Sequence, residues 1–259
     1  MAMRLLTKEQ MIERLKEVKD RGWIRSLRPL NSGGIGNTID SLLGFPESNL
    51  PVADTAQWEL KSHRVGSSAL LTLFAMEPEP RKERVVVRVL LPKYGWPHQS
   101  GQLGELSFRQ TLRCTQPTDR GFGLKVDRER QKVLVYFEAC RVEARHSGWL
   151  RTVEERVGLG GLDPQPYWDF QNLSFKASTK LLNSFYVEAE ATRHNGDEYF
   201  RVSRVLMLQG FDIDGFVAAM EQGAALVDFD ARTHHNHGTK FRLRQDQTPR
   251  LYRYADTVL

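Results

Sequence analysis

Hydrophobic and polar residues alternate along this chain in patterns that predict both helices and strands. Apolar residues recur at helical spacing over residues 7–21, where Thr7 and Gln10 also have the spacing of a capping box. Helices are expected as well over residues 148–157 and 212–221. Apolar or alternating runs predict strands at residues 58–62, 69–76, 84–91, 103–112, 121–126, 132–138, 184–192, 198–208 and 225–229. The chain therefore mixes helices with many short strands, as α/β and α+β proteins do.

Interruptions of these patterns indicate turns and a division of the chain. Asn195 and Gly196 separate two strand-like runs, which is a strong signal for a β-hairpin. Glycine and proline are concentrated in residues 158–166, so two lobes are expected, residues 1–157 and 158–259. The strands between residues 69 and 138 are expected to form the sheet that includes the strand at 58–62.

That short strand carries the residues with the clearest chemistry. Glu59 and Lys61 are two positions apart, so on a strand they point to one face, about 7 Å apart. Trp58 and Leu60 would point to the opposite face, toward a core. Asp54 lies in the loop before the strand and can fold back toward Glu59. Two carboxylates can hold a hard divalent cation, and an adjacent ammonium can position a water, which together suit phosphodiester hydrolysis. A surface ion pair on an edge strand is the alternative interpretation.

Composition limits the class of protein. The 259 residues are 40% hydrophobic, which suffices for one large domain or two lobes. The two cysteines, Cys114 and Cys140, give no disulfide framework or zinc cluster, and Cys140 is expected to be a packed thiol. No apolar run has membrane-spanning length and the N-terminus lacks a signal core, so a cytoplasmic protein that does not enter membranes is expected.

The positive charge is concentrated near the C-terminus. The net charge is +5, and residues 231–254 hold six basic residues and one acidic residue, which accounts for the whole excess. Such a stretch favours a polyanionic partner. Its residues include types that read base edges in DNA, namely His235, Asn236, His237, Lys240, Arg242 and Arg244.

Other interpretations of the basic stretch stay open from the sequence. A solvated tail, an acidic protein partner or lipid headgroups also fit the positive charge. A weak zinc site formed by His234, His235 and His237 is a further alternative. Lys176 and Lys180 either contact phosphate or belong to a solvated helix face.

Three blocks of sequence resemble a known family. Residues 31–44 read NSGGIGNTIDSLLG, Asp54 is followed by ELKSHR at 59–64, and residues 235–242 read HNHGTKFR. A nucleotide-binding loop is the alternative for the first block, but no clear strand precedes it and no Gly-Lys-Ser/Thr follows. In their order and spacing the blocks resemble the MvaI and BcnI restriction endonucleases, which are related to the MutH nicking nuclease and belong to the PD-(D/E)xK superfamily.

The resemblance implies a fold and roles for individual residues. The fold would be restriction-endonuclease-like, in the α/β (α+β) class, with a mixed central β-sheet flanked by helices and two lobes forming a DNA-binding cleft. Asp54 and Glu59 would bind Mg²⁺, and Lys61 would hold or polarise the attacking water. Asp40 would take the place of a glutamate in the relatives, so its shorter side chain puts direct metal ligation in doubt. Asn37 and Arg64, in the same blocks, would contact DNA.

These roles lead to a functional prediction. The chain is expected to be a monomeric, Mg²⁺-dependent type II restriction endonuclease that cuts double-stranded DNA at a short pseudo-symmetric site of the CCNGG kind and leaves 5′-phosphate ends. The first lobe would be catalytic and the second would recognise DNA. The alternatives are a MutH-like strand-nicking repair endonuclease and a DNA-binding protein without catalytic activity.

Overall fold

The chain folds into two compact units, each built from segments that are far apart in the sequence. The computed structural model describes residues 6–28, 33–44, 58–67, 69–99, 101–181 and 183–259. The first unit comprises Met1–Ala69, Ser178–Asp212 and Thr248–Leu259, and the second comprises Leu70–Ala177 and Ile213–Gln247. The expected division at residue 158 does not coincide with a boundary between these units. The stretch 158–166 lies inside the second unit, where Leu162 is buried.

A mixed sheet forms the centre of the first unit. Its strand order is β1-β10-β9-β2, and β13 also pairs with β10. Strand β2 runs parallel to β9, whereas the other pairs are antiparallel. The strands span Ile24–Arg25 (β1), Trp58–Arg64 (β2), Asn183–His194 (β9), Asp197–Phe211 (β10) and Tyr252–Thr257 (β13). Strand β2 is therefore at one edge of this sheet, as expected for the strand that carries Glu59 and Lys61.

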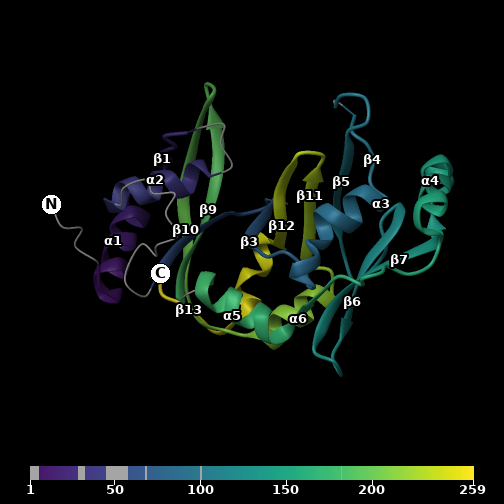
Figure 1. Ribbon diagram of the computed structural model, residues 1–259. Coiled ribbons are helices and arrows are strands. Elements are labelled where there is room, and N and C mark those ends of the chain that lie inside the picture. The colour runs from purple at the N-terminus through teal and green to yellow at the C-terminus, as the bar shows by residue number, and fades with distance from the viewer. Residues whose placement is uncertain (1–5, 29–32, 45–57, 68, 100, 182) are drawn as a thin grey trace. The chain divides into compact units, whose positions relative to one another are not determined.

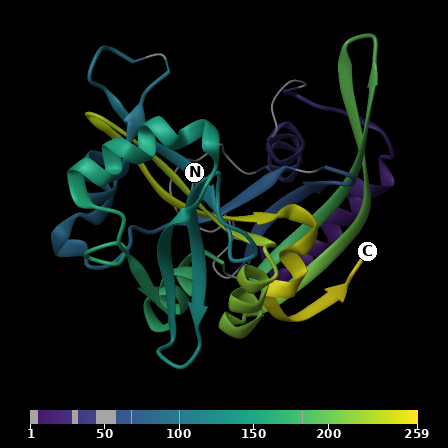
Figure 2. The same cartoon turned by 90° about the vertical axis from the view of Figure 1, so that its right-hand side faces the viewer.

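The β9–β10 hairpin confirms the prediction from Asn195 and Gly196. Both residues have positive φ, 51° and 85°, which is the backbone that a two-residue type I′ turn requires. His194 and Asp197 pair across the turn. The hairpin is the long green ribbon of Figure 1, and Figure 2 shows it from the side.

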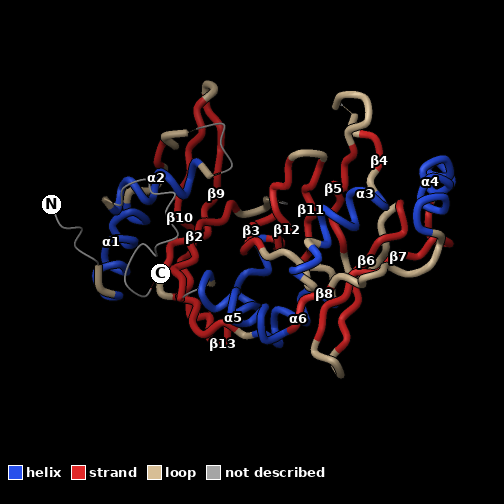
Figure 3. Tube along the Cα trace, in the orientation of Figure 1, coloured by secondary structure: helices blue, strands red, loops and turns tan. Residues whose placement is uncertain are grey.

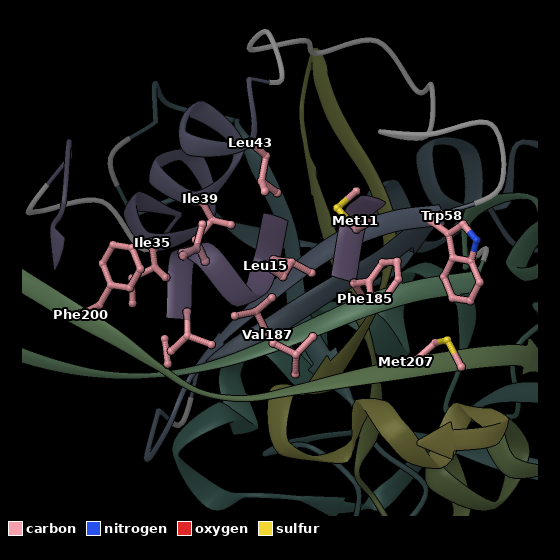
Figure 4. Packing of buried hydrophobic residues seen from close by; sticks show 14 residues of the cluster. Met11, Leu15, Ile35, Ile39, Leu43, Trp58, Phe185, Val187, Phe200 and Met207 are labelled. Carbon is pink, nitrogen blue, oxygen red and sulfur yellow. The ribbon is translucent and has the colours of Figure 1, made fainter. Parts of the chain in front are cut away.

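Two helices cover one face of this sheet. Helix α1 (Lys8–Asp20) begins with the predicted capping box of Thr7 and Gln10, and helix α2 is Gly34–Leu43. Their apolar residues pack with the sheet in one core, together with side chains from β2, β9 and β10 (Figure 4). Trp58 and Phe185 are both part of it, with ring centroids 4.8 Å apart. This core fixes which face of β2 is turned inward.

The second unit contains two further sheets among the described residues. One has the order β3-β12-β11-β5-β4 and the other the order β6-β7-β8. Their strands are Leu70–Ala75 (β3), Trp96–Pro97 (β4), Leu106–Leu112 (β5), Arg120–Asp127 (β6), Lys132–Val142 (β7), Tyr167–Asp169 (β8), Ala225–Arg232 (β11) and His235–Arg244 (β12). The strands expected between residues 69 and 138 thus lie in this unit, so the prediction that they form the sheet of Glu59 and Lys61 is wrong. That sheet is built from the hairpin instead, because β2 pairs with β9.

Helices complete the second unit. They are α3 (Leu91–Tyr94), α4 (Ser147–Val157), α5 (Phe170–Lys180, whose residues from Ser178 on belong to the first unit) and α6 (Ile213–Glu221), with short helical turns at Arg81–Glu83 and Ala144–His146. The helical turn Gln245–Leu251 begins in the second unit and ends in the first. Within the described ranges, no helix is both long and apolar enough to cross a membrane. The aromatic core includes Phe108, which meets Phe122 and Phe229 edge-to-face.

Three local predictions are corrected by the structure. Residues 84–91 are helical rather than a strand: a π-helical turn covers Val86–Leu90 and leads into α3 (Figure 3). Val85, Val86, Val89 and Leu90 are all buried, and their spacing is helical although valine favours strands. The histidine-rich segment, which lies outside the predicted strands, is the start of β12. Cys140 is exposed rather than packed.

Candidate active site and DNA-reading face

The two faces of strand β2 have different surroundings. Trp58 is buried in the core beneath α1 and α2, and Leu60 packs against the same core. Glu59 and Lys61 point to the opposite face because side chains alternate along a strand. The Lys61 Nζ donates a hydrogen bond to Glu59 Oε1 at 2.7 Å. The Lys61 side chain is only 13% exposed and that of Glu59 is 32% exposed. This confirms that the two residues point to one face of an edge strand, where they form a partly buried ion pair.

The neighbouring strands complete the surroundings of this pair. In the parallel register Glu59 is aligned with Ser184 and Lys61 with Tyr186. The Ser184 hydroxyl lies 3.3 Å from the Tyr252 hydroxyl. Ser184, Tyr186 and Tyr252 are all buried. Burial raises the pKa of Tyr252 to about 12, the hydrogen bond with Ser184 opposes this, and the negative charge of Glu59 adds to it. The carboxylate of Glu59 therefore acts electrostatically on a buried neutral phenol.

The pKa of Tyr252 predicts a loss of stability at high pH. The Tyr252 phenol ionises near pH 10 in the unfolded chain and near pH 12 in the folded chain. The neutral phenol therefore contributes fully to the free energy of unfolding below pH 10, and this contribution is lost as pH rises to about 12. Over that interval we expect the free energy of unfolding to fall by about 2–3 kcal/mol more in the parent than in Tyr252→Phe. Urea unfolding at several pH values measures this. Both proteins should carry Cys114→Ser, because burial raises the pKa of Cys114 to about 12 as well. Equal slopes in the two proteins would contradict the assignment.

Glu59 fits a ligand for a hard divalent cation. Its Oε1 accepts a hydrogen bond from Lys61. Among the described residues none donates a hydrogen bond to Oε2, and this oxygen is accessible to solvent. A solvent-accessible carboxylate oxygen is the ligand type that Mg²⁺ takes. Asp54, the other expected ligand, lies outside the described residues. Within the described part of the chain no group of three His, Cys, Asp or Glu side chains is placed to hold a metal. His234, His235 and His237 therefore do not form such a group either.

Helix α2 places the other residues of the first sequence block next to β2. A Cβ added at Gly36 would lie 3.0 Å from the Ser62 hydroxyl, so glycine permits the close approach of helix and strand. Asn37 and Asp40 are half-buried on this helix. Their expected roles in DNA contact and catalysis stay predictions.

Arg64 has a partner that the sequence did not indicate. Its Nη2 donates to Glu198 Oε1 at 2.6 Å, and the Glu198 side chain is 3% exposed. The second oxygen, Oε2, is buried without a hydrogen-bond partner. Arg64 therefore neutralises a buried carboxylate on β10, and contact with DNA stays a prediction for this residue.

In the second unit, one face of the β5–β11–β12 sheet carries alternating charges. Arg242 donates to Asp228 at 3.1 Å, and Asp230 accepts from Lys240 at 3.4 Å and pairs with Arg109 at 2.7 Å. The opposite face carries buried Phe108, Val227, Phe229, Phe241 and Leu243. The sequence pointed to Lys240 and Arg242 but not to Asp228, Asp230 and Arg109. The available signal was the alternation in LVDFDAR, which places both aspartates on one face.

The tip of this sheet holds the histidine-rich segment. His235 Nε2 and His237 Nδ1 lie 3.2 Å apart, and the Asn236 amide donates to Glu77 at 3.3 Å. Arg244, at the other end of β12, pairs with Asp246 at 3.4 Å. The structure thus places the six predicted DNA-contacting residues of the C-terminal block on one strand.

Comparisons with known proteins agree with this architecture. A family model described as "MvaI/BcnI restriction endonuclease family" matches residues 12–252. The solved structure "Restriction endonuclease MvaI-cognate DNA substrate complex" is similar at 22% identity, with a TM-score of 0.71, over 98% of this chain and 100% of that one. "Restriction endonuclease MvaI in the absence of DNA" is similar at 20% identity, with a TM-score of 0.60, over 99% and 100%. No curated protein matches the sequence.

Proposed function

Because the chain belongs to the MvaI/BcnI restriction endonuclease family, we propose that it is a type II restriction endonuclease that hydrolyses double-stranded DNA with Mg²⁺. Its site would be short and pseudo-symmetric, of the CCNGG kind, and its products would carry 5′-phosphate ends. The enzyme would act as a monomer in the cytoplasm. The observation that carries the proposal is the Glu59–Lys61 pair, 2.7 Å apart on the edge strand β2.

The residues of β2 divide the catalytic work. Glu59 and Asp54 would hold the ion, with Asp40 in a supporting position. When bound, Mg²⁺ lowers the pKa of a coordinated water and offsets charge on the phosphate. The Lys61 ammonium orients the attacking water and donates toward a phosphate oxygen. Its low exposure strengthens that interaction, because a partly buried charge is screened less by water.

The charged sheet face of the second unit would read the bases. Asp228 and Asp230 hold Arg242, Lys240 and Arg109. Arginine and lysine fit the two acceptors of guanine, and a carboxylate can accept from the amino group of cytosine. Such a face suits a site of G·C pairs. On this account the first unit cuts and the second unit recognises DNA, with His235, Asn236, His237 and Arg244 adding contacts and with Asn37 and Arg64 contacting the backbone.

Replacing Arg242 tests the reading face. Arg242→Ala removes a guanidinium that Asp228 holds in place, and we expect discrimination between the recognised site and a site with one changed base pair to fall by about 1–3 kcal/mol. Competition binding with the two duplexes measures this, and Arg130→Ala, at an exposed arginine on the β6–β7 turn, is the matched control. Unchanged discrimination would remove Arg242 from this role.

Digestion of a plasmid of known sequence tests the activity. We expect discrete linear fragments with Mg²⁺, none with EDTA, and sequenced ends that fall at one short site. Nicked circles without linear product would favour the MutH-like alternative. Binding that is the same with and without metal, with no cutting, would favour the DNA-binding protein.

A further inference from the structure

A cavity of about 870 Å³ lies in the second unit, between the end of β3, the segment 81–87, helix α5 and the start of β12. Its walls include the buried residues Met76, Val85 and Val86. Phe175, on α5, also lines it and is 73% exposed. An aromatic ring this exposed beside an open cavity is available to a ligand.

The charged residues of this cavity are mainly cationic. Arg81, Arg84 and Lys176 line it together with one acidic residue, Glu77. Glu77 is occupied within the protein: it accepts hydrogen bonds from Asn236 Nδ2, the Thr239 amide and the Thr239 hydroxyl. Arg81 is paired with Glu79 at 3.0 Å. The lining as a whole keeps a positive charge, which favours an anionic ligand.

Arg84 has a backbone conformation that is unusual for its residue type. Its φ is 47°, in the left-handed region that glycine adopts without penalty and other residues adopt at a cost. Its side chain is exposed and forms no ion pair among the described residues. Nothing in the described fold therefore uses this guanidinium. Arg84 ends the helical turn Arg81–Glu83, where its amide donates to the Arg81 carbonyl at 2.9 Å, so this turn fixes the backbone of a residue that lines the cavity.

We propose that this cavity binds one nucleotide of the DNA strand next to the recognised bases. The backbone phosphate would lie against Arg84, Arg81 and Lys176, and the sugar or base would lie against Phe175, since stacking on an aromatic ring is independent of sequence. Asn236 connects the cavity with the reading face, because it lines the cavity and belongs to β12. The proposal rests on the proposed function, and it adds a contact outside the recognition site.

The variant Arg84→Gly separates binding from folding. Glycine suits the left-handed backbone, so we expect a melting temperature close to that of the parent, and Arg84→Asn provides a second variant that tolerates this conformation. Affinity for an uncut duplex, measured in EDTA at several salt concentrations, should fall. The slope of log affinity against log salt should become less steep by about 0.9, the change for one lost phosphate contact. Phe175→Ala should also weaken binding but leave the slope unchanged.

Controls identify which proposal fails. Arg130→Ala removes an exposed arginine of the same unit that does not line the cavity, and its affinity and slope should match the parent. If Arg84→Gly and Arg84→Asn bind DNA as the parent does, or no more weakly than Arg130→Ala, the proposal is overturned. It is also overturned if inorganic phosphate raises the melting temperature of the parent but not of Arg84→Gly while their DNA affinities are equal, since the site would then take free phosphate. A parent that binds DNA but does not cut it contradicts the proposed function and leaves this test in force. A parent that does not bind DNA overturns both.

Discussion

Replacing Lys61 by alanine is expected to abolish DNA cleavage while DNA binding is retained. The Lys61 ammonium lies 2.7 Å from Glu59 Oε1 and its side chain is only 13% exposed, so alanine removes the partly buried positive charge beside the Glu59 carboxylate. Loss of a group that moves protons or stabilises charge in the transition state costs about 10²–10⁴-fold in rate. Single-turnover cleavage with enzyme in excess measures this, because it separates the chemical step from binding.

The matched control is Lys16→Ala, an exposed lysine on α1 of the same unit. Its cleavage rate should equal that of the parent. Lys61→Arg keeps the charge but changes its shape, so little activity should return. A Lys61→Ala protein that still cuts DNA at the parent rate, or one that fails to bind DNA but cuts at high concentration, would contradict the assigned role.

Replacing Arg64 by alanine is expected to give the largest loss of stability among these variants. It would leave the Glu198 carboxylate, 3% exposed and already with one unpartnered oxygen, buried without a countercharge. Breaking a buried ion pair costs about 3–5 kcal/mol, and partial exposure of Arg64 lowers the expected loss to about 2–4 kcal/mol. Urea unfolding at neutral pH measures the change.

Two further variants test the cause of that loss. Arg64→Ala combined with Glu198→Gln should recover part of the stability, because the buried charge is then gone. Arg25→Ala breaks the exposed pair with Asp197 at 2.9 Å on the same sheet, and its effect should be much smaller. Arg64→Ala as stable as the parent would contradict this stabilising role, whether or not DNA binding also weakens.

Local patterns in the sequence predicted the elements that depend on neighbouring residues. The capping box of α1, the Asn195–Gly196 turn and the inward position of Trp58 all follow from residues a few positions apart. The family resemblance could be seen for the same reason, since its blocks are short, and the family model that matches residues 12–252 confirms it. The shared face of Glu59 and Lys61 could be predicted because both residues are on one strand.

Interactions across long sequence distances could not be predicted. Strand β2 pairs with β9, more than a hundred residues away, whereas the sequence order favoured the strands that follow directly. The pair of Arg64 with Glu198 joins residues 134 positions apart. Asp228 and Asp230 were missed because their role depends on the register of β11 with β12 and β5, which no single strand reveals. Residues 85–90 are rich in valine and buried, and a short apolar run of this kind is typical of a buried strand as well as of a buried helix.

The most direct test of the catalytic account is to locate the metal. Crystals of the protein with uncut DNA, grown with Mn²⁺ in place of Mg²⁺, would show the ion by its anomalous scattering. The account predicts a peak within coordination distance of the Glu59 carboxylate and of Asp54, with the Lys61 ammonium beside the phosphate to be cut. A peak bound elsewhere, with Glu59 still held only by Lys61 while the same crystals cleave DNA, would contradict it.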